Sequence, residues 1–336
     1  MALDIARARL ATQRLVAPYF ATPVDVVRGL VAVQAQDYAA GLWAIGQRTA
    51  DATRADVERA LADREIVRTW PMRGTLHVVA RDDVRWLTAF LAARVLKRAA
   101  GRHRQLGLDA KTFAKARTLF EKHLAGGNSL TRPEMYAILA RAKIAPGDQR
   151  GTHILTTLAM ERLLCFGAHR GKQATYTLLD EWIPSSRTVD GDEALAELAR
   201  RYFLGHGPAT VDDFAWWTGL NLTESRRAVE MVRADLESHG EYWSGPLQTA
   251  RAGSAQLLSA WDEFTVGYRD RSAMVAAKHV TKTLNGLAWC VAVDGRIVGM
   301  WRRARGRVSV EPFARLDARQ AKAIERARAR YDVFTC

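Results

Sequence analysis

The chain has 336 residues, of which 48% are hydrophobic, so it can build two or three domains with a sizeable core, and its composition excludes a largely disordered protein. Fifty lysines and arginines against 36 aspartates and glutamates give a formal net charge of +14. This basic excess favours a polyanionic partner, most often nucleic acid, and an arginine-rich genome is the alternative explanation of the charge.

The first hundred residues have the pattern of three helices followed by a hairpin. Thr22 and Pro23 form a helix N-terminal signal, and Arg73-Gly74 forms a turn between two β-like runs. The expected helices cover residues 4–16, 23–33 and 54–62, and the expected strands cover 66–72 and 75–80. Three helices and a hairpin in this order are typical of a winged helix.

The same order recurs twice further along the chain. The second set has expected helices over 111–124, 132–142 and 152–164 and strands over 165–167 and 174–179. The third has helices over 193–204, 211–218 and 223–236, with a strand at Tyr242-Trp243. The spacing varies, so this is a repeat of architecture and not a solenoid period.

The last eighty residues change to short β-like runs. These cover 289–293, 297–301 and 308–310 and precede a final helix over 318–330. Asp294-Gly295 between two of the runs is a strong hairpin signal. We therefore predict an α+β fold, mainly α, with winged-helix domains at 1–100, 101–185 and 186–250, followed by a small β-barrel or sheet at 251–336.

Several kinds of site are missing from the sequence. The three cysteines, Cys165, Cys290 and Cys336, are far apart, so we expect a reducing compartment, no metal site and no cofactor. There is no phosphate-binding loop and no nucleophile elbow. The N-terminus lacks the apolar region of a signal peptide and no apolar run could span a bilayer. We expect a cytoplasmic, nucleoid-associated monomer.

Cations are concentrated at a predicted turn. His169, Arg170 and Lys172 surround Gly171 between two apolar strands, which is where the wing of a winged helix reaches a phosphate or a groove. A solvated turn that touches nothing is the alternative. We predict that these three residues contact double-stranded DNA.

Five blocks of sequence resemble the AlkZ-like family of winged-helix DNA glycosylases. The blocks are Val33-Gln-Ala-Gln-Asp37, Trp70 to His77, Asp213 to Gly219, Trp261 to Phe264 together with Gly267 to Arg271, and Val293 to Trp301. The resemblance spans about residues 5–315. It implies tandem winged helices bent into a C around DNA and then a small β-barrel. The related AlkX branch has Asp at the second motif position, so Gln36 favours the AlkZ branch.

The resemblance makes Gln34 and Gln36 the expected catalytic pair. A purine alkylated at N7 is cationic and leaves readily, so a neutral amide that positions water can suffice without a strong base. In a regular helix two residues this close in sequence diverge, whereas in extended backbone they share a face. Joint action therefore requires the second helix to end or distort at Gln34. Capping of that helix, or contact with solvent, is the alternative role for both glutamines.

Three more residues are weaker candidates. Asp37 could steady the sugar cation electrostatically, or it could cap the next element. Arg73 and His77 lie on the first hairpin and could contact DNA, although His77 could equally be a satisfied interior residue.

The predicted function is hydrolysis of the N-glycosidic bond of N7-alkylated purines in DNA, with bulky adducts and interstrand crosslinks among the candidate substrates. The biological role is repair or self-resistance to alkylating natural products. The alternatives are a non-catalytic winged-helix regulator and a glycosylase of the AlkX type. The paired glutamines favour the first function over a regulator.

Overall fold

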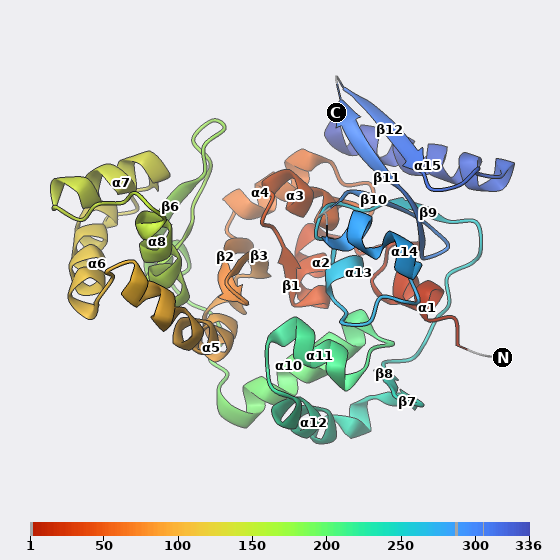
Figure 1. The fold of residues 1–336 in the computed structure, drawn as a ribbon, viewed down its shortest axis with the longest axis horizontal. Coiled ribbons are helices and arrows are strands. Elements are labelled where there is room, and N and C mark those ends of the chain that lie inside the picture. Colours follow the sequence, from red (N-terminus) through yellow and green to blue (C-terminus); the bar gives the residue numbers. More distant parts are fainter. Residues whose placement is uncertain (1–2, 286–287, 305) are drawn as a thin grey trace. The chain divides into compact units, whose positions relative to one another are not determined.

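The structure is a computed structural model that describes residues 3–285, 288–304 and 306–336. It is a mixed α and β protein, about 49% helical, with several small sheets. The chain folds into two compact units (Figure 1): unit 1 comprises Met1–Arg59 and Leu195–Cys336, and unit 2 comprises Ala60–Ala194. It passes between them within helices α4 (Arg54–Ala62) and α10 (Gly191–His206).

Unit 1 contains both ends of the chain. Its other helices are α1 (Ile5–Thr12), α2 (Pro23–Leu30), α3 (Tyr38–Gly46), α11 (Val211–Thr218), α12 (Leu222–Met231), α13 (Glu263–Val266), α14 (Ala277–Val280) and α15 (Ala318–Thr335), with a 3₁₀ helix η1 (Arg233–Asp235) and a π-helix η2 (Thr281–Asn285). Its strands are β1 (Ala32–Gln34), β7 (Glu237–His239), β8 (Tyr242–Ser244), β9 (Ala255–Leu257), β10 (Cys290–Val293), β11 (Arg296–Ala304) and β12 (Arg307–Pro312).

The C-terminal strands form an open sheet in the order β12-β11-β10-β9. Asp294 and Gly295 join β10 to β11 with φ of +49° and +78°, as the Asp-Gly hairpin signal predicts. Helix α15 packs on β9 and β10. Of the two expected forms, a barrel or a sheet, the described residues form the open sheet and no closed barrel, and a helix covers the sheet.

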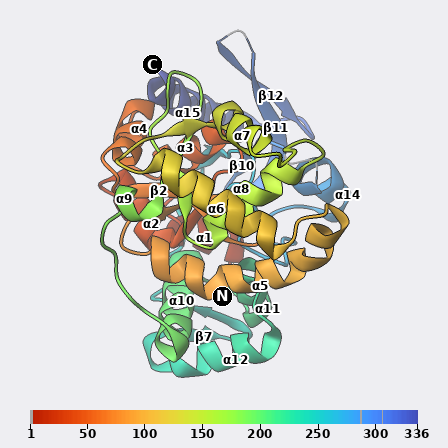
Figure 2. The ribbon, with the colours of Figure 1, turned by 90° about the vertical axis from the view of Figure 1, so that its left-hand side faces the viewer.

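Unit 2 is built on the hairpin of β2 (Ile66–Met72) and β3 (Thr75–Ala80). Its helices are α5 (Val84–Gln105), α6 (Ala110–Leu124), α7 (Arg132–Arg141), α8 (Arg150–Met160) and α9 (Leu179–Trp182), and its second sheet has the order β4 (Leu130–Thr131), β6 (Thr175–Leu178), β5 (Leu164–Phe166). Helix α5 packs on β2 and α8, and α6 packs on α7 and α8 (Figure 2).

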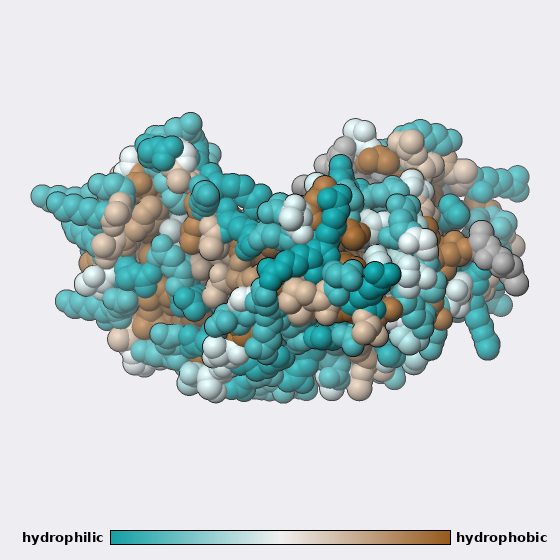
Figure 3. Space-filling model, turned by 90° about the horizontal axis from the view of Figure 1, so that it is seen from below, coloured by the Kyte–Doolittle hydropathy of each residue, from teal (hydrophilic) through white to brown (hydrophobic). Residues whose placement is uncertain are grey.

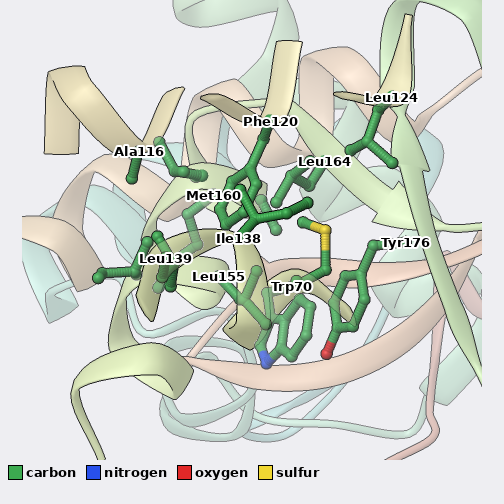
Figure 4. Close-up of a cluster of buried hydrophobic side chains, with 14 of the residues drawn as sticks. Trp70, Ala116, Phe120, Leu124, Ile138, Leu139, Leu155, Met160, Leu164 and Tyr176 are labelled. Atoms are coloured by element: carbon green, nitrogen blue, oxygen red, sulfur yellow. The ribbon is translucent and has the colours of Figure 1, made fainter. Parts of the chain in front are cut away.

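In the core of unit 2, side chains of the β2–β3 hairpin pack against side chains of the helices. Trp70 of β2 is 6% exposed, and its ring stacks on Tyr176 at 6.5 Å between centroids. Phe120 of α6 and Leu155 of α8 belong to the same cluster (Figure 4). Burying side chains of this size contributes roughly 1.5–3 kcal/mol each. Trp70 is thus a core residue and not a platform for a base.

The division of the chain differs in detail from the expected segments. Residue 100, the expected end of the first domain, lies inside α5, and strand β9 starts at Ala255 in the expected C-terminal segment. The division into four domains stays a prediction.

No helix in the described part of the chain is long and apolar enough to cross a membrane. The face drawn in Figure 3 is mainly hydrophilic, with apolar residues interspersed.

Candidate active site at the Gln34 segment

The backbone leaves the helical conformation before it reaches Gln34. Helix α2 begins with a capping box between Thr22 and Asp25 and ends at Leu30, because Val31 adopts φ of +67°. This left-handed conformation is strained for a β-branched residue. The chain then continues as strand β1 to Gln34. The second helix therefore ends before Gln34, earlier than expected, and joint action of Gln34 and Gln36 stays a prediction.

The Gln34 side chain carries an unsatisfied acceptor. Gln34 is 7% exposed, and its Oε1 is buried without a hydrogen-bond partner among the residues that the structure describes. Buried polar groups nearly always form hydrogen bonds, and a buried group left without a hydrogen bond costs about 1–3 kcal/mol. This carbonyl therefore has the capacity for a further hydrogen bond.

The next three residues fix the start of α3. Ala35 is 1% exposed and packs against Gly41, where an added Cβ would lie 2.7 Å from the Ala35 Cβ. Gln36 is exposed and lies in a bend. Asp37 is also exposed, and its Oδ1 accepts a hydrogen bond from the Ala40 N–H at 2.8 Å. Capping α3 is therefore a sufficient reason for an aspartate at this position.

A buried carboxylate holds the Gln34 backbone. Glu263, at the start of α13, is 0% exposed. Its Oε1 accepts the Gln34 N–H at 2.9 Å, and its Oε2 accepts the Trp217 indole N–H at 2.8 Å. The Nε2 of His206 lies 3.5 Å from Oε2. Glu263 belongs to one of the sequence blocks that resemble the family, but the sequence gives no sign that it reaches Gln34, which is 229 positions away.

Asp262, the residue before Glu263, holds the start of α13 in place. Its side chain forms a fully buried ion pair with Arg48 at 2.7 Å and accepts a hydrogen bond from Gln47 at 2.6 Å. It also caps α13 through the Phe264 N–H at 2.9 Å. Asp262 thus ties the end of α3 to the start of α13, the two elements that border the Gln34 segment.

In unit 2, Arg73 and His77 interact with each other. Arg73 and Gly74 form the β2–β3 turn with φ of +54° and +75°. His77 is 0% exposed, and its ring nitrogens lie 3.0 Å from the Thr75 carbonyl oxygen and 3.2 Å from an Arg73 guanidinium nitrogen. His77 is an interior residue that orients Arg73, which is half-buried.

The second candidate hairpin has an exposed tip. Backbone hydrogen bonds between Arg170 and Gln173 close the turn over Gly171 and Lys172, and Gly171 has φ of +60°. His169 and Lys172 are exposed. Arg170 is exposed too, but its guanidinium binds Glu134 Oε1 at 2.8 Å and the Ser129 carbonyl oxygen at 2.7 Å.

Glu134 is itself held in the charged form. Hydrogen bonds from Thr131 lower the pKa of Glu134 below its ordinary value, and Arg170 lowers it further. The hairpin tip is therefore fixed to the start of α7, and Lys172 is the cation at the tip that this network does not engage.

Two of the three cysteines, Cys165 and Cys290, are buried. Burial raises the pKa of the Cys290 thiol to about 12 and also raises that of Cys165, so both thiols are neutral and poor nucleophiles. No group of three or more potential metal ligands occurs in the described part of the chain. A cavity of about 640 Å³ in unit 1 is lined by α1, α15 and residues 248–257 and does not include Gln34. The case for a site at Gln34 therefore depends on the geometry of the Gln34 segment itself.

The comparisons with known proteins agree with the sequence blocks. The model of the family described as DNA glycosylase AlkZ-like matches residues 27–334. The chain belongs to the AlkZ-like DNA glycosylase family. A relative from Streptomyces sahachiroi named interstrand DNA cross-link repair glycosylase is 26% identical over 332 residues, which cover 91% of this chain and 88% of that protein.

The fold agrees as well. The solved structure of Streptomyces sahachiroi DNA glycosylase AlkZ superposes with a TM-score of 0.83 at 24% identity and covers 98% of this chain and 95% of that one. Within the AlkZ-like fold of this chain, the predicted site residues fall into two sets. Gln34, Gln36 and Asp37 form one segment of unit 1, whereas Arg73, His77 and the residues of the 169–172 turn belong to unit 2.

Proposed function

We propose that this chain is a DNA glycosylase that hydrolyses the N-glycosidic bond of N7-alkylated purines, with Gln34 and Gln36 as its catalytic residues. The observation that carries the proposal is the buried Gln34 carbonyl, which has no hydrogen-bond partner among the described residues. Its position in the motif of an AlkZ-like DNA glycosylase supports a role in the reaction.

The reaction needs little acid or base catalysis. Alkylation at N7 makes the purine cationic, so the C1′–N9 bond breaks with its electron pair leaving on the base. Water adds to C1′ of the sugar cation and loses a proton to solvent. The Gln34 carbonyl accepts a hydrogen bond from that water, and the Gln36 amide assists in placing it. Asp37 supplies negative charge near the sugar cation in addition to capping α3.

The proposed substrates include bulky adducts and interstrand crosslinks, and the proposed role is repair or self-resistance. The name of the Streptomyces sahachiroi relative supports the crosslink substrate. A duplex that carries a guanine N7–N7 crosslink tests this part. The wild-type protein is expected to separate the strands on a denaturing gel and to leave an abasic site; intact crosslinks after prolonged incubation would contradict it.

We further propose that the repeated helix–hairpin units are winged helices, that the C-shaped arrangement of the family applies, and that the protein acts as a monomer at the nucleoid. Arg73, His169, Arg170 and Lys172 contact the phosphate backbone, and His77 holds Arg73. Contacts of this kind fix the position of the duplex and carry little sequence information.

Binding to duplex DNA is expected to be sensitive to salt because of the net charge of +14. If the protein neutralises about six phosphates, log K falls with log salt at a slope of roughly −5. Fluorescence anisotropy with a labelled duplex at several salt concentrations measures this slope. A flat dependence would count against the proposed DNA surface.

Replacement of Arg170 and Lys172 by alanine is expected to weaken binding to damaged and undamaged duplexes alike. The salt slope becomes shallower by about 1 to 2, because each lost phosphate contact removes roughly one released counterion. Base release also slows when protein is subsaturating. Lys172 accounts for most of the loss, since Arg170 is shared with Glu134.

The control is Arg319→Ala with Lys322→Ala, which removes the same charge from the exposed face of α15. Single-turnover excision is measured against protein concentration for both double variants. Equal curves for wild type and the hairpin variant would exclude the 169–172 turn from the DNA site.

A further inference from the structure

The Glu263 carboxylate lies between two elements of unit 1. It accepts one hydrogen bond from the Gln34 backbone and one from the Trp217 side chain of α11, at 2.9 and 2.8 Å. All three residues are buried, and Glu263 and Trp217 are 0% exposed. Moving a carboxylate from water to a buried position is costly. A glutamate at this position therefore indicates that its hydrogen bonds have a role.

Backbone strain lies on both sides of this contact. Val31, three residues before Gln34, has φ of +67°, and Trp261, two residues before Glu263, has φ of +54°. Left-handed conformations are strained for β-branched and aromatic residues and persist where the surrounding structure enforces them, often at functional sites. Both partners of the hydrogen bond thus lie within three residues of a strained backbone position.

The contact also limits where the Gln34 side chain can lie. The Gln34 N–H is one bond from the Cα that carries the side chain, so the carboxylate fixes the root of that side chain. Ala35 is held next to it by its contact with Gly41. The unpartnered Oε1 therefore projects from a backbone that is clamped on both sides.

We infer that Glu263 is a positioning residue, which holds Gln34 so that its carbonyl meets the attacking water. The inference rests on the proposed function of Gln34. A shift of about 1 Å in a catalytic group can reduce a rate by about 100-fold, so loss of this hydrogen bond acts on the rate of base release and leaves DNA binding in place.

The chemistry of the contact provides a selective test. A carboxylate accepts from two donors at once, whereas the amide of Glu263→Gln offers one carbonyl oxygen and one NH₂ group. In this variant the NH₂ group of the amide points at one of the two donors, either the Gln34 N–H or the Trp217 indole N–H. The hydrogen bond to that donor is lost. Trp217→Phe removes the indole donor. In the double variant the amide carbonyl is free to accept the Gln34 N–H.

Single-turnover release of N7-methylguanine from a duplex is measured for four proteins: wild type, Glu263→Gln, Trp217→Phe and the double variant. Glu263→Gln is expected to lower the saturating rate by about 10- to 100-fold with little change in Kd for DNA. The double variant is expected to recover most of the rate of Trp217→Phe. Glu230→Gln, at an exposed position of α12, controls for the lost charge.

Amide hydrogen exchange of the peptide that contains Gln34 is the second measurement. Exchange is expected to accelerate in Glu263→Gln and to slow again in the double variant. Wild-type rate and wild-type exchange in Glu263→Gln would overturn the inference, and so would a rate loss that Trp217→Phe does not relieve. If the wild type releases no base, the proposed function fails, and the catalytic part of the inference fails with it. The exchange data then still decide whether Glu263 holds Gln34.

Discussion

Replacement of Gln34 and Gln36 together by alanine is expected to abolish release of N7-alkylguanine and to leave DNA affinity nearly intact. The pair is proposed to position water, and neither side chain belongs to the proposed phosphate contacts. Of the two single variants, Gln34→Ala is expected to cost more, because Gln34 holds the buried acceptor whereas Gln36 is exposed. Positioning of a reactant is worth several powers of ten in rate.

The measurement is single-turnover excision at saturating protein, with affinity taken from anisotropy of the same duplex. Gln248→Ala, an exposed glutamine outside the motif, is the matched control and is expected to retain the wild-type rate. Equal turnover by the double variant and the wild type would remove the catalytic assignment.

Asp262→Ala is expected to lower the free energy of unfolding by about 3–5 kcal/mol, because it leaves the buried Arg48 guanidinium without its carboxylate. Both side chains of this pair are 0% exposed. The variant also loses the cap of α13 and the Gln47 contact. Urea unfolding gives the change in free energy.

Glu58→Ala is the matched control. It removes an exposed partner of Arg54 within α4, and pairs of this kind contribute about 0.3–0.5 kcal/mol. Removing both Arg48 and Asp262 is expected to cost less than the sum of the single changes, since neither charge is then left alone. An unfolding midpoint for Asp262→Ala equal to that of Glu58→Ala would show that the buried pair contributes nothing.

The local signals in the sequence predicted much of the fold. The bounds of α4, α11, β2 and β3 are as expected, and the Arg73-Gly74 turn has the two positive φ values that a tight hairpin needs. These elements have clear caps, turns or alternation. Helix α3 was missed because seven of its nine residues are buried, so it is apolar all round and shows no 3.6-residue period.

Helix α5 was missed for a different reason. It runs for 22 residues through Gly101, where the expected second domain begins. A glycine inside a helix costs only about 1 kcal/mol, and packing of α5 against β2 and α8 outweighs that cost. The sequence left a barrel and a sheet open for the C-terminal segment, because the pairing of edge strands has no local sequence signal, and the described strands form the open sheet.

The candidate site was predicted only in part. The resemblance points to Gln34 and Gln36, and of the two only Gln34 lies in a strand, whereas Gln36 lies in a bend. The burial of Gln34 and its contact with Glu263 depend on the packing of α2, α11 and α13, which lie far apart in sequence. For His77 and Asp37 the sequence left two roles open each, and the structure shows that His77 is fully buried and that Asp37 caps α3.

The most direct test of the central claim uses a duplex with a single N7-methylguanine and excess wild-type protein. Mass spectrometry measures the free base, and alkaline cleavage measures abasic sites. The account predicts that free N7-methylguanine and abasic sites appear in equal amounts, well above spontaneous depurination. Tight binding of the duplex with base release no faster than in buffer would contradict it and would favour a non-catalytic DNA-binding protein.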